Sequence, residues 1–311
     1  MKCKMFKLFI HLVNLLVFLS GLFVLITGAR VYKKTFKAKP TDISLNKELY
    51  DVRLKQLEGY KHQKMLVESS KNKYNVEMMH IKSNYESNNV IILIHGLYAN
   101  YYDLLPTAFR YLNDGYNVIL YNQRQTGETG GKSNSFGYYE RYDLEEIATI
   151  ARRIYPSGKI GVHGFSMGAA TAIMHSELNE TSNLVDFYIF DAPYHTMKSA
   201  VELAAKRGKD TKIPPWFVTF SGDAFLKLKE RISYEDIVPS NVIHKSTRPI
   251  LLIHGDLDDW TLPAGSKQLY EKISHDKKRL VTFPLEKHCS AHVNSEDKYF
   301  EAIHQFIQEF S

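Results

Sequence analysis

The sequence predicts an α/β fold in which helices cover both faces of a mostly parallel central sheet. From about residue 60 to the end, short apolar runs of strand length alternate with longer segments of helical character. The chain has 311 residues, of which 44% are hydrophobic and 24% charged, which is enough to bury one sizeable core. We therefore expect one large domain over residues 60–311.

The sequence predicts a hairpin, then alternating strands and helices, and one helical insertion. Two runs at 64–69 and 74–81 flank Lys71-Asn72-Lys73 and are typical of a β-hairpin. The alternation that follows predicts strands at 90–95, 117–121, 159–163, 186–191, 249–254 and 279–283, and helices at 103–113, 143–154, 167–178, 265–274 and 296–310. The segment 195–245 interrupts this pattern with Met197–Lys206, Pro214-Pro215-Trp216-Phe217 and Ala224–Arg231. We interpret it as a small helical lid inserted after the strand at 186–191.

The first thirty residues differ in composition from the rest. Lys2, Lys4 and Lys7 precede a run from Leu8 to Ala29 that is long enough to cross a bilayer core of about 30 Å. We expect residues 1–30 to form a retained membrane anchor with a basic leader and residues 31–59 to form a polar linker. A cleaved signal peptide is the alternative, although Thr27-Gly-Ala29 is a poor cleavage site.

The charges around this run give conflicting indications of orientation. Five basic residues follow the run, against three before it, and loop charge alone would place the C-terminal side inside. An uncleaved export signal would instead deliver the domain outward. We expect a single-pass protein of the cell membrane with an extracytoplasmic domain. The flanking charges contribute much of the net charge of +6 and could rest on anionic lipid headgroups.

Gly164-Phe165-Ser166-Met167-Gly168 is the motif most informative about chemistry. It fits G-x-S-x-G, follows a predicted strand and precedes a predicted helix, which is the strand–turn–helix context that this motif requires. Small residues two before and two after Ser166 allow neighbouring backbone to pass close to it. Ser166 is therefore the candidate nucleophile, with the Met167 N–H aimed at a developing oxyanion.

A serine of ordinary pKa needs a base, and the base needs an acid to orient it. Both follow in the sequence, because the predicted strand 249–254 leads to Asp256, Asp258 and Asp259, and the strand 279–283 leads to His288. Upstream, the strand 90–95 ends in a His-Gly step at 95–96, which predicts a second oxyanion N–H on Leu97.

With these four elements in this order, the chain resembles the α/β-hydrolase superfamily, and within it a branch of membrane-anchored bacterial serine hydrolases that are similar to esterases. The resemblance covers roughly residues 60–311 and implies a serine hydrolase with no cofactor. A carboxylesterase acting on small or medium acyl esters is the activity we expect. An amidase or peptidase with the same triad and a non-catalytic binding protein on the same scaffold remain alternatives.

The triad acid is ambiguous between two neighbours. The family pattern H-G-x-x-D-x-x-V-P places the acid three residues after the glycine and four before the proline, but Gly255 and Pro263 are one residue too far apart. Counting forward gives Asp258, and counting back gives Asp259. We expect Asp258, because the end of the strand fixes Gly255 and the extra residue is more easily absorbed on the solvent side.

Other residues compete for roles at the site. His95, His163 and His254 precede glycines at strand ends and are expected to be structural, whereas His292 is the rival of His288 as the base. Cys289 follows His288 and is expected to be a packing residue.

Aromatic side chains flank the predicted site on two sides. They either line an apolar acyl pocket or pack the lid onto the body: Trp216, Phe217, Phe220 and Phe225 in the lid, and Tyr98, Tyr101 and Tyr102 after the oxyanion turn.

Several function classes have no support in the sequence. No metal-ligand spacing or phosphate-binding loop is present, and no basic patch interleaved with aromatic residues indicates a nucleic-acid partner. We expect a small-molecule ester as substrate and the membrane as the other partner. The sequence does not indicate an oligomeric state.

Overall fold

The computed structural model describes residues 2–37, 47–208 and 213–311. Its strands are β1 (His62–Ser69), β2 (Tyr74–Ile81), β3 (Val90–Ile94), β4 (Asn117–Tyr121), β5 (Ile160–Phe165), β6 (Phe187–Asp191), β7 (Ile250–Gly255) and β8 (Lys278–Phe283). Its helices are α1 (Lys2–Thr35), α2 (Lys47–Leu57), α3 (Leu105–Asn113), α4 (Glu140–Ile154), α5 (Met167–Ser182), α6 (Met197–Arg207), α7 (Pro215–Glu230), α8 (Pro263–Lys272), α9 (Ala291–Asn294) and α10 (Glu296–Phe310). Short 3₁₀ helices lie at Tyr101–Leu104, Tyr234–Asp236, Pro239–Asn241 and Ile243–Lys245.

The strands form one eight-stranded sheet in the order β1-β2-β4-β3-β5-β6-β7-β8. β1 and β2 are antiparallel, β2 pairs antiparallel with β4, and the pairs from β4 to β8 are all parallel. The predicted hairpin and mostly parallel sheet are confirmed. Because parallel strands point the same way, the carboxyl ends of β3, β5, β7 and β8 meet at one edge.

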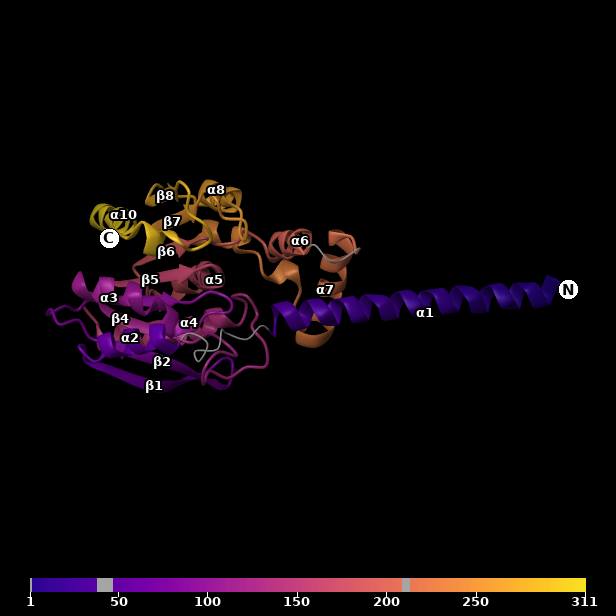
Figure 1. Ribbon diagram of the computed structural model, residues 1–311, viewed down its shortest axis with the longest axis horizontal. Helices are drawn as coiled ribbons and strands as arrows, with labels where there is room; N and C mark the ends of the chain where they lie inside the picture. Colours follow the sequence, from indigo (N-terminus) through magenta and orange to yellow (C-terminus); the bar gives the residue numbers. More distant parts are fainter. Residues whose placement is uncertain (1, 38–46, 209–212) are drawn as a thin grey trace.

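Helices cover both faces of the sheet, as the alternation predicts (Figure 1). On one face α3 and α10 pack against strand residues such as Ile91 and Leu93. On the other face α4, α5 and α8 pack against the alternate residues of the same strands, such as Ile92 and Ile94. Burial of alternate residues on opposite faces follows from the two-residue period of a strand and explains why these runs are continuously apolar.

The segment between β6 and β7 contains α6 and α7. The sequence suggested a proline-containing stretch followed by a helix from Ala224, but α7 is one helix that begins at Pro215. A proline at the first helical position costs nothing, because the N–H that it lacks would have no partner within the helix. The two helices lie on the side of the body from which α1 projects, and α7 packs against α1 (Figure 1).

α1 is a continuous helix that extends beyond the predicted anchor. Within the described residues it is long and apolar enough to cross a membrane, and its most apolar 18-residue stretch has a mean hydropathy of 2.5. Its amino-terminal part projects away from the body, and its last turns pack against α7 (Figure 1). Tyr32 and Phe36 are buried in a third apolar cluster with residues of α6 and α7. The range expected as a linker, 31–59, thus starts inside α1 and includes α2, and its residues 38–46 lie outside the described ones.

Candidate active site

Ser166 lies at the turn between β5 and α5. Its backbone has φ 53° and ψ −112°, a conformation that costs a non-glycine residue energy and persists only where the surroundings enforce it. The flanking glycines are required by close packing. A Cβ on Gly168 would lie 2.3 Å from the Ile94 carbonyl oxygen, and one on Gly164 would lie 2.4 Å from the Gly168 carbonyl oxygen. The turn thus matches the strained strand-to-helix geometry that the motif predicts.

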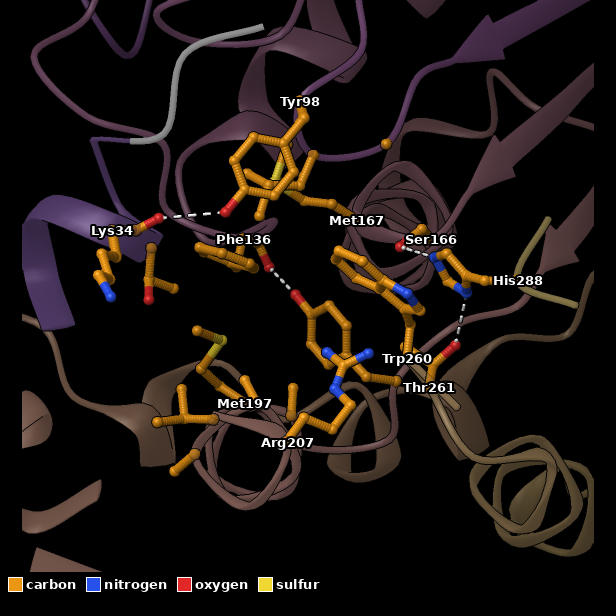
Figure 2. A pocket seen from close by; sticks show the side chains of 18 of the residues that line it. Lys34, Tyr98, Phe136, Ser166, Met167, Met197, Arg207, Trp260, Thr261 and His288 are labelled. Atoms are coloured by element: carbon orange, nitrogen blue, oxygen red, sulfur yellow. Dashed lines mark hydrogen bonds between the residues drawn. The ribbon is translucent and has the colours of Figure 1, made fainter. Parts of the chain in front are cut away.

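A chain of hydrogen bonds joins the three sequence-predicted residues. His288 Nε2 is 2.9 Å from Ser166 Oγ, and His288 Nδ1 is 2.7 Å from Asp258 Oδ2. Figure 2 shows the bond between Ser166 and His288. Ser166 follows β5, Asp258 follows β7 and His288 follows β8, so the three side chains converge at the carboxyl edge of the sheet.

The Asp258 carboxylate is buried and fully engaged. Oδ1 accepts hydrogen bonds from the backbone N–H groups of Trp260 and Thr261, at 2.8 and 3.0 Å. Oδ2 accepts from the Thr261 hydroxyl at 3.0 Å. Burial alone would raise the pKa of Asp258, but the hydrogen bonds from His254 and His288 outweigh it and hold the pKa well below its usual range. The carboxylate therefore stays ionised. Asp259, the alternative acid, is exposed.

The two predicted oxyanion residues flank Ser166. Met167 is the first residue of α5, so its N–H points out of the helix and has no partner within it. Leu97 follows Gly96, and a Cβ on Gly96 would lie 3.3 Å from the Ser166 Cβ. The loop after β3 therefore passes directly beside the serine. Both Leu97 and Met167 line the cavity over Ser166.

The other histidines are held in structural contacts. His95 Nδ1 donates to the Gly96 carbonyl at 2.8 Å while Nε2 accepts from the Gln123 N–H at 3.0 Å. His163 is 3.0 and 2.9 Å from the hydroxyls of Tyr111 and Tyr299. His254 contacts Ser266 Oγ and the Thr261 carbonyl, and its Nε2 is also 3.1 Å from Asp258 Oδ2.

His292 and Cys289 border the cavity behind His288. Burial lowers the pKa of His292 to about 4, and its ring lies against Phe165 with centroids 5.0 Å apart. The imidazole within hydrogen-bond reach of Ser166 Oγ is that of His288, at 2.9 Å, whereas the His292 ring packs on Phe165. Burial raises the pKa of the Cys289 thiol well above its usual range, so little of it is the reactive thiolate.

A cavity of about 1050 Å³ opens above Ser166 and His288. Figure 2 shows Tyr98, Met197, Arg207 and Trp260 around it. Of the two roles considered for the lid aromatics, lining the cavity is not the one observed, because Trp216, Phe217, Phe220 and Phe225 lie outside its lining. They lie along α7, where Phe217 stacks on Phe23 and Phe225 contacts Tyr32. Of the three tyrosines near the oxyanion turn, Tyr98 lines the cavity, whereas Tyr101 is buried and donates to Glu77.

Sequence reasoning missed several residues at the site. Thr261 bonds Asp258 and lies 3.2 Å from His288 Nδ1, and the Trp260 ring is stacked on the His288 ring at 6.0 Å. Both residues follow Asp258 in the same loop, and this closeness in the sequence could have identified them as site residues. Arg207, whose guanidinium lies 4.5 Å from the Trp260 ring centroid, comes from α6 and had no such signal. Across the described ranges, no cluster of His, Cys, Asp or Glu side chains is arranged to hold a metal ion.

Comparisons with known proteins agree with this architecture. A family model of the α/β hydrolase fold matches residues 89–220. The uncharacterized protein YqkD of Bacillus subtilis is 30% identical over 239 residues, covering 76% of this chain and 77% of that protein. A proline iminopeptidase of Saccharolobus solfataricus is 24% identical and covers 72% of this chain and 86% of its own.

Solved structures show the same fold. The esterase Pf2001 of Pyrococcus furiosus superposes with a TM-score of 0.66 at 22% identity, covering 82% of this chain and 95% of that one. Est1E of Butyrivibrio proteoclasticus, solved with ferulic acid bound, gives a TM-score of 0.58 at 17% identity; the match covers 79% of this chain and 98% of that one. By its sequence match and its sheet, this chain belongs to the α/β-hydrolase superfamily.

Proposed function

We propose that this hydrolase is a serine carboxylesterase that cleaves small or medium acyl esters through an acyl-enzyme. The observation that carries the proposal is the continuous chain from Ser166 Oγ through His288 to the ionised Asp258. A serine, an imidazole within hydrogen-bond reach and a buried acid behind it form the arrangement that makes a hydroxyl nucleophilic near neutral pH.

The proposed reaction has two halves. Ser166 Oγ attacks the ester carbonyl carbon while His288 Nε2 takes the hydroxyl proton, and the N–H groups of Leu97 and Met167 hold the oxyanion. The tetrahedral intermediate collapses, the alkoxide leaves with the proton from His288, and the acyl group remains on Ser166. Water, deprotonated by His288, then attacks the acyl-enzyme and releases the carboxylic acid. Asp258 fixes the imidazole tautomer throughout and stabilises the imidazolium.

The test is labelling and turnover of the full-length chain in detergent. A fluorophosphonate probe should label the wild type and not Ser166→Ala, and Ser166→Ala should lose nearly all hydrolysis of p-nitrophenyl butyrate. Ser274→Ala, which changes an exposed serine away from the cavity, is the matched control. Retention of more than a few per cent of turnover by Ser166→Ala would remove Ser166 from the nucleophile role.

Amide or peptide hydrolysis is a second candidate, because a proline iminopeptidase is among the relatives. The same triad serves both reactions, and only the leaving group and the pocket differ. Proline p-nitroanilide offered beside p-nitrophenyl butyrate separates the two. A binding protein without catalysis would show neither turnover nor labelling.

We further propose that residues 8–29 anchor the chain in the cell membrane and that the body faces outward. The length and apolar composition of α1 support an anchor. A signal sequence has the same two properties, so the experiment must distinguish the two. In spheroplasts, added protease should digest the body while a cytosolic marker stays whole. Protection until permeabilisation would reverse the orientation, and release of a shortened chain into the medium would favour a cleaved signal peptide.

A further inference from the structure

One face of α1 forms a wall of the cavity over Ser166. The α1 residues that line the cavity are Thr27, Arg30, Val31, Lys34 and Thr35. Successive lining residues are separated by three, one, three and one positions in the sequence, which places them all on one side of the helix. The helix proposed as the anchor is therefore also part of the substrate site. Lys34 faces the same cavity as Ser166 in Figure 2.

The cavity begins at the level where the apolar run of α1 ends. Thr27 is within the run 8–29 and lines the cavity, and Arg30 is the first charged residue after the run. In a membrane-spanning helix, such a change from apolar to basic residues marks the boundary between hydrocarbon and headgroups. The cavity thus connects this boundary with the serine.

The seam between α1 and α7 fixes the wall in place. A Cβ on Gly28 would lie 2.3 Å from the Ser221 carbonyl oxygen, and a Cβ on Gly222 would lie 2.8 Å from Val31 Cγ1. Small residues that let two helix backbones approach this closely are typical of helix pairs within membranes. α1 therefore holds α7 at a defined depth beside the apolar run.

The amino end of α7 has the surface of an interfacial helix. Trp216 is 66% and Phe220 57% exposed, while Phe217 stacks on Phe23 of the apolar run with centroids 5.2 Å apart. At a rise of about 1.5 Å per residue, Phe23 lies roughly 9 Å before Ala29 along the helix axis. Exposed aromatic side chains at this depth are stabilised by contact with the headgroup and acyl boundary.

α6 supplies another wall of the cavity, in addition to the wall formed by α1. Apart from Arg207 at its carboxyl end, its lining residues are apolar and mostly small: Met197, Ala200, Val201, Ala204 and Ala205. The resulting volume of about 1050 Å³ lies at the upper limit of roughly 300–1,000 Å³ for ordinary ligand sites. A largely apolar cavity of this size, lined by α1 and α6 where the apolar run of α1 ends, fits a hydrocarbon chain.

We infer that the substrate is an acyl ester whose hydrocarbon chain resides in the bilayer, and that it reaches Ser166 between α1, α6 and α7. This inference rests on the proposed esterase function and adds the source and the chemical class of its substrate. The ester carbonyl would lie beside Ser166 and the chain would extend along α1 toward Thr27.

Surface dilution tests the source of the substrate. The full-length protein is reconstituted into vesicles containing 1-lauroylglycerol and an inert ether-linked phospholipid. Diluting the ester tenfold with the phospholipid, at constant total ester, should lower the rate about tenfold, because the rate then follows the concentration within the bilayer. A rate that is unchanged by this dilution would overturn the inference.

Variants test the proposed passage between α1, α6 and α7. Val31→Trp on α1 and Ala204→Trp on α6 should each lower kcat/KM for 1-lauroylglycerol at least about tenfold more than for p-nitrophenyl acetate, because a filled passage excludes the longer chain. Ala204 is exposed, so its variant tests the passage even if Val31→Trp disturbs the seam. Val17→Trp, on an exposed part of α1 away from the cavity, is the matched control.

The outcomes separate this inference from the function it rests on. Equal losses on both esters, or none in either variant, would overturn the passage while leaving the esterase intact. Absence of fluorophosphonate labelling in the wild type would instead remove the proposed function.

Discussion

The sheet edge that carries Ser166 and the helical wall that faces it are built by different means. At the sheet edge, hydrogen bonds fix His288 and Asp258, and the backbone at Ser166 is held in a strained conformation. In the wall, α1, α6 and α7 meet mainly through apolar packing, as the cluster around Tyr32 and Met197 shows. Directional bonds impose one geometry, whereas apolar packing tolerates exchange of residues of similar volume.

This difference separates chemistry from selection of the substrate. A change at the sheet edge should stop turnover of every substrate, because it alters the reacting groups themselves. A change in the wall should alter which substrates react, or the stability of the helices, and leave the reacting groups in place. Variants in the two regions should therefore differ both in the kind and in the size of their effect.

Replacing Asp258, the proposed triad acid, should have the largest effect. Asp258→Asn should set the wrong imidazole tautomer on His288 and lower kcat by orders of magnitude, with a loss of about 10⁴ in the protease precedent. Asp259→Asn is the matched control and should change kcat by less than about tenfold, because Asp259 is exposed. Steady-state hydrolysis of p-nitrophenyl butyrate measures both. The reverse pattern would assign the acid to Asp259.

A bulky side chain in the helical seam should have the next largest effect. Gly28→Leu would force α1 away from the Ser221 carbonyl and should destabilise the contact by roughly 1–3 kcal/mol, as overpacking does. Limited proteolysis in detergent should then cut α6 and α7 faster. Gly21→Leu is the control, since a Cβ at Gly21 meets no atom within 4 Å. Equal resistance of the two variants to the protease would show that the contact between α1 and α7 does not hold these helices in place.

Acidification should weaken the sheet edge through His95. Burial lowers the pKa of His95 to about 4, below the ordinary value of 6.5, so the unfolded chain binds the proton first. This group's contribution to the free energy of unfolding is complete above pH 6.5 and is lost as pH falls toward 4, by up to about 1.4 kcal/mol per pH unit. Urea unfolding in detergent should give a shallower pH slope for His95→Gln. An identical slope would mean that His95 titrates normally.

The smallest effect is expected at Cys289, which lies between the two regions. Its thiol pKa is raised by burial, so iodoacetamide at pH 8 should modify the native protein slowly and the unfolded protein rapidly. Cys289→Ser should change kcat by less than about tenfold, because the thiol takes no part in the proposed reaction. Mass spectrometry measures the modification. Rapid labelling of the native protein would mark Cys289 as a reactive group.

The sequence predicted the sheet edge far better than the wall. The strands, their mostly parallel pairing and the converging ends of β5, β7 and β8 follow from apolar periodicity and short motifs, both of which are local signals. The contact between Gly28 and Ser221 joins helices far apart in the chain, and nothing in either segment specifies the other. For the same reason the sequence left the lid aromatics with two possible roles, since nothing near Phe217 or Phe225 identifies α1 as the element that they contact.

Separation along the chain also sets an order for biosynthesis. Gly28 leaves the ribosome roughly 190 residues before its partner Ser221. At about 5–20 residues per second, α1 would wait roughly 10–40 s before α7 exists to cover it. During that interval the bilayer is the available environment that shields its apolar surface. Assembly of the cavity would then be a late event at the membrane surface, and a chain that missed the membrane would expose α1 to aggregation.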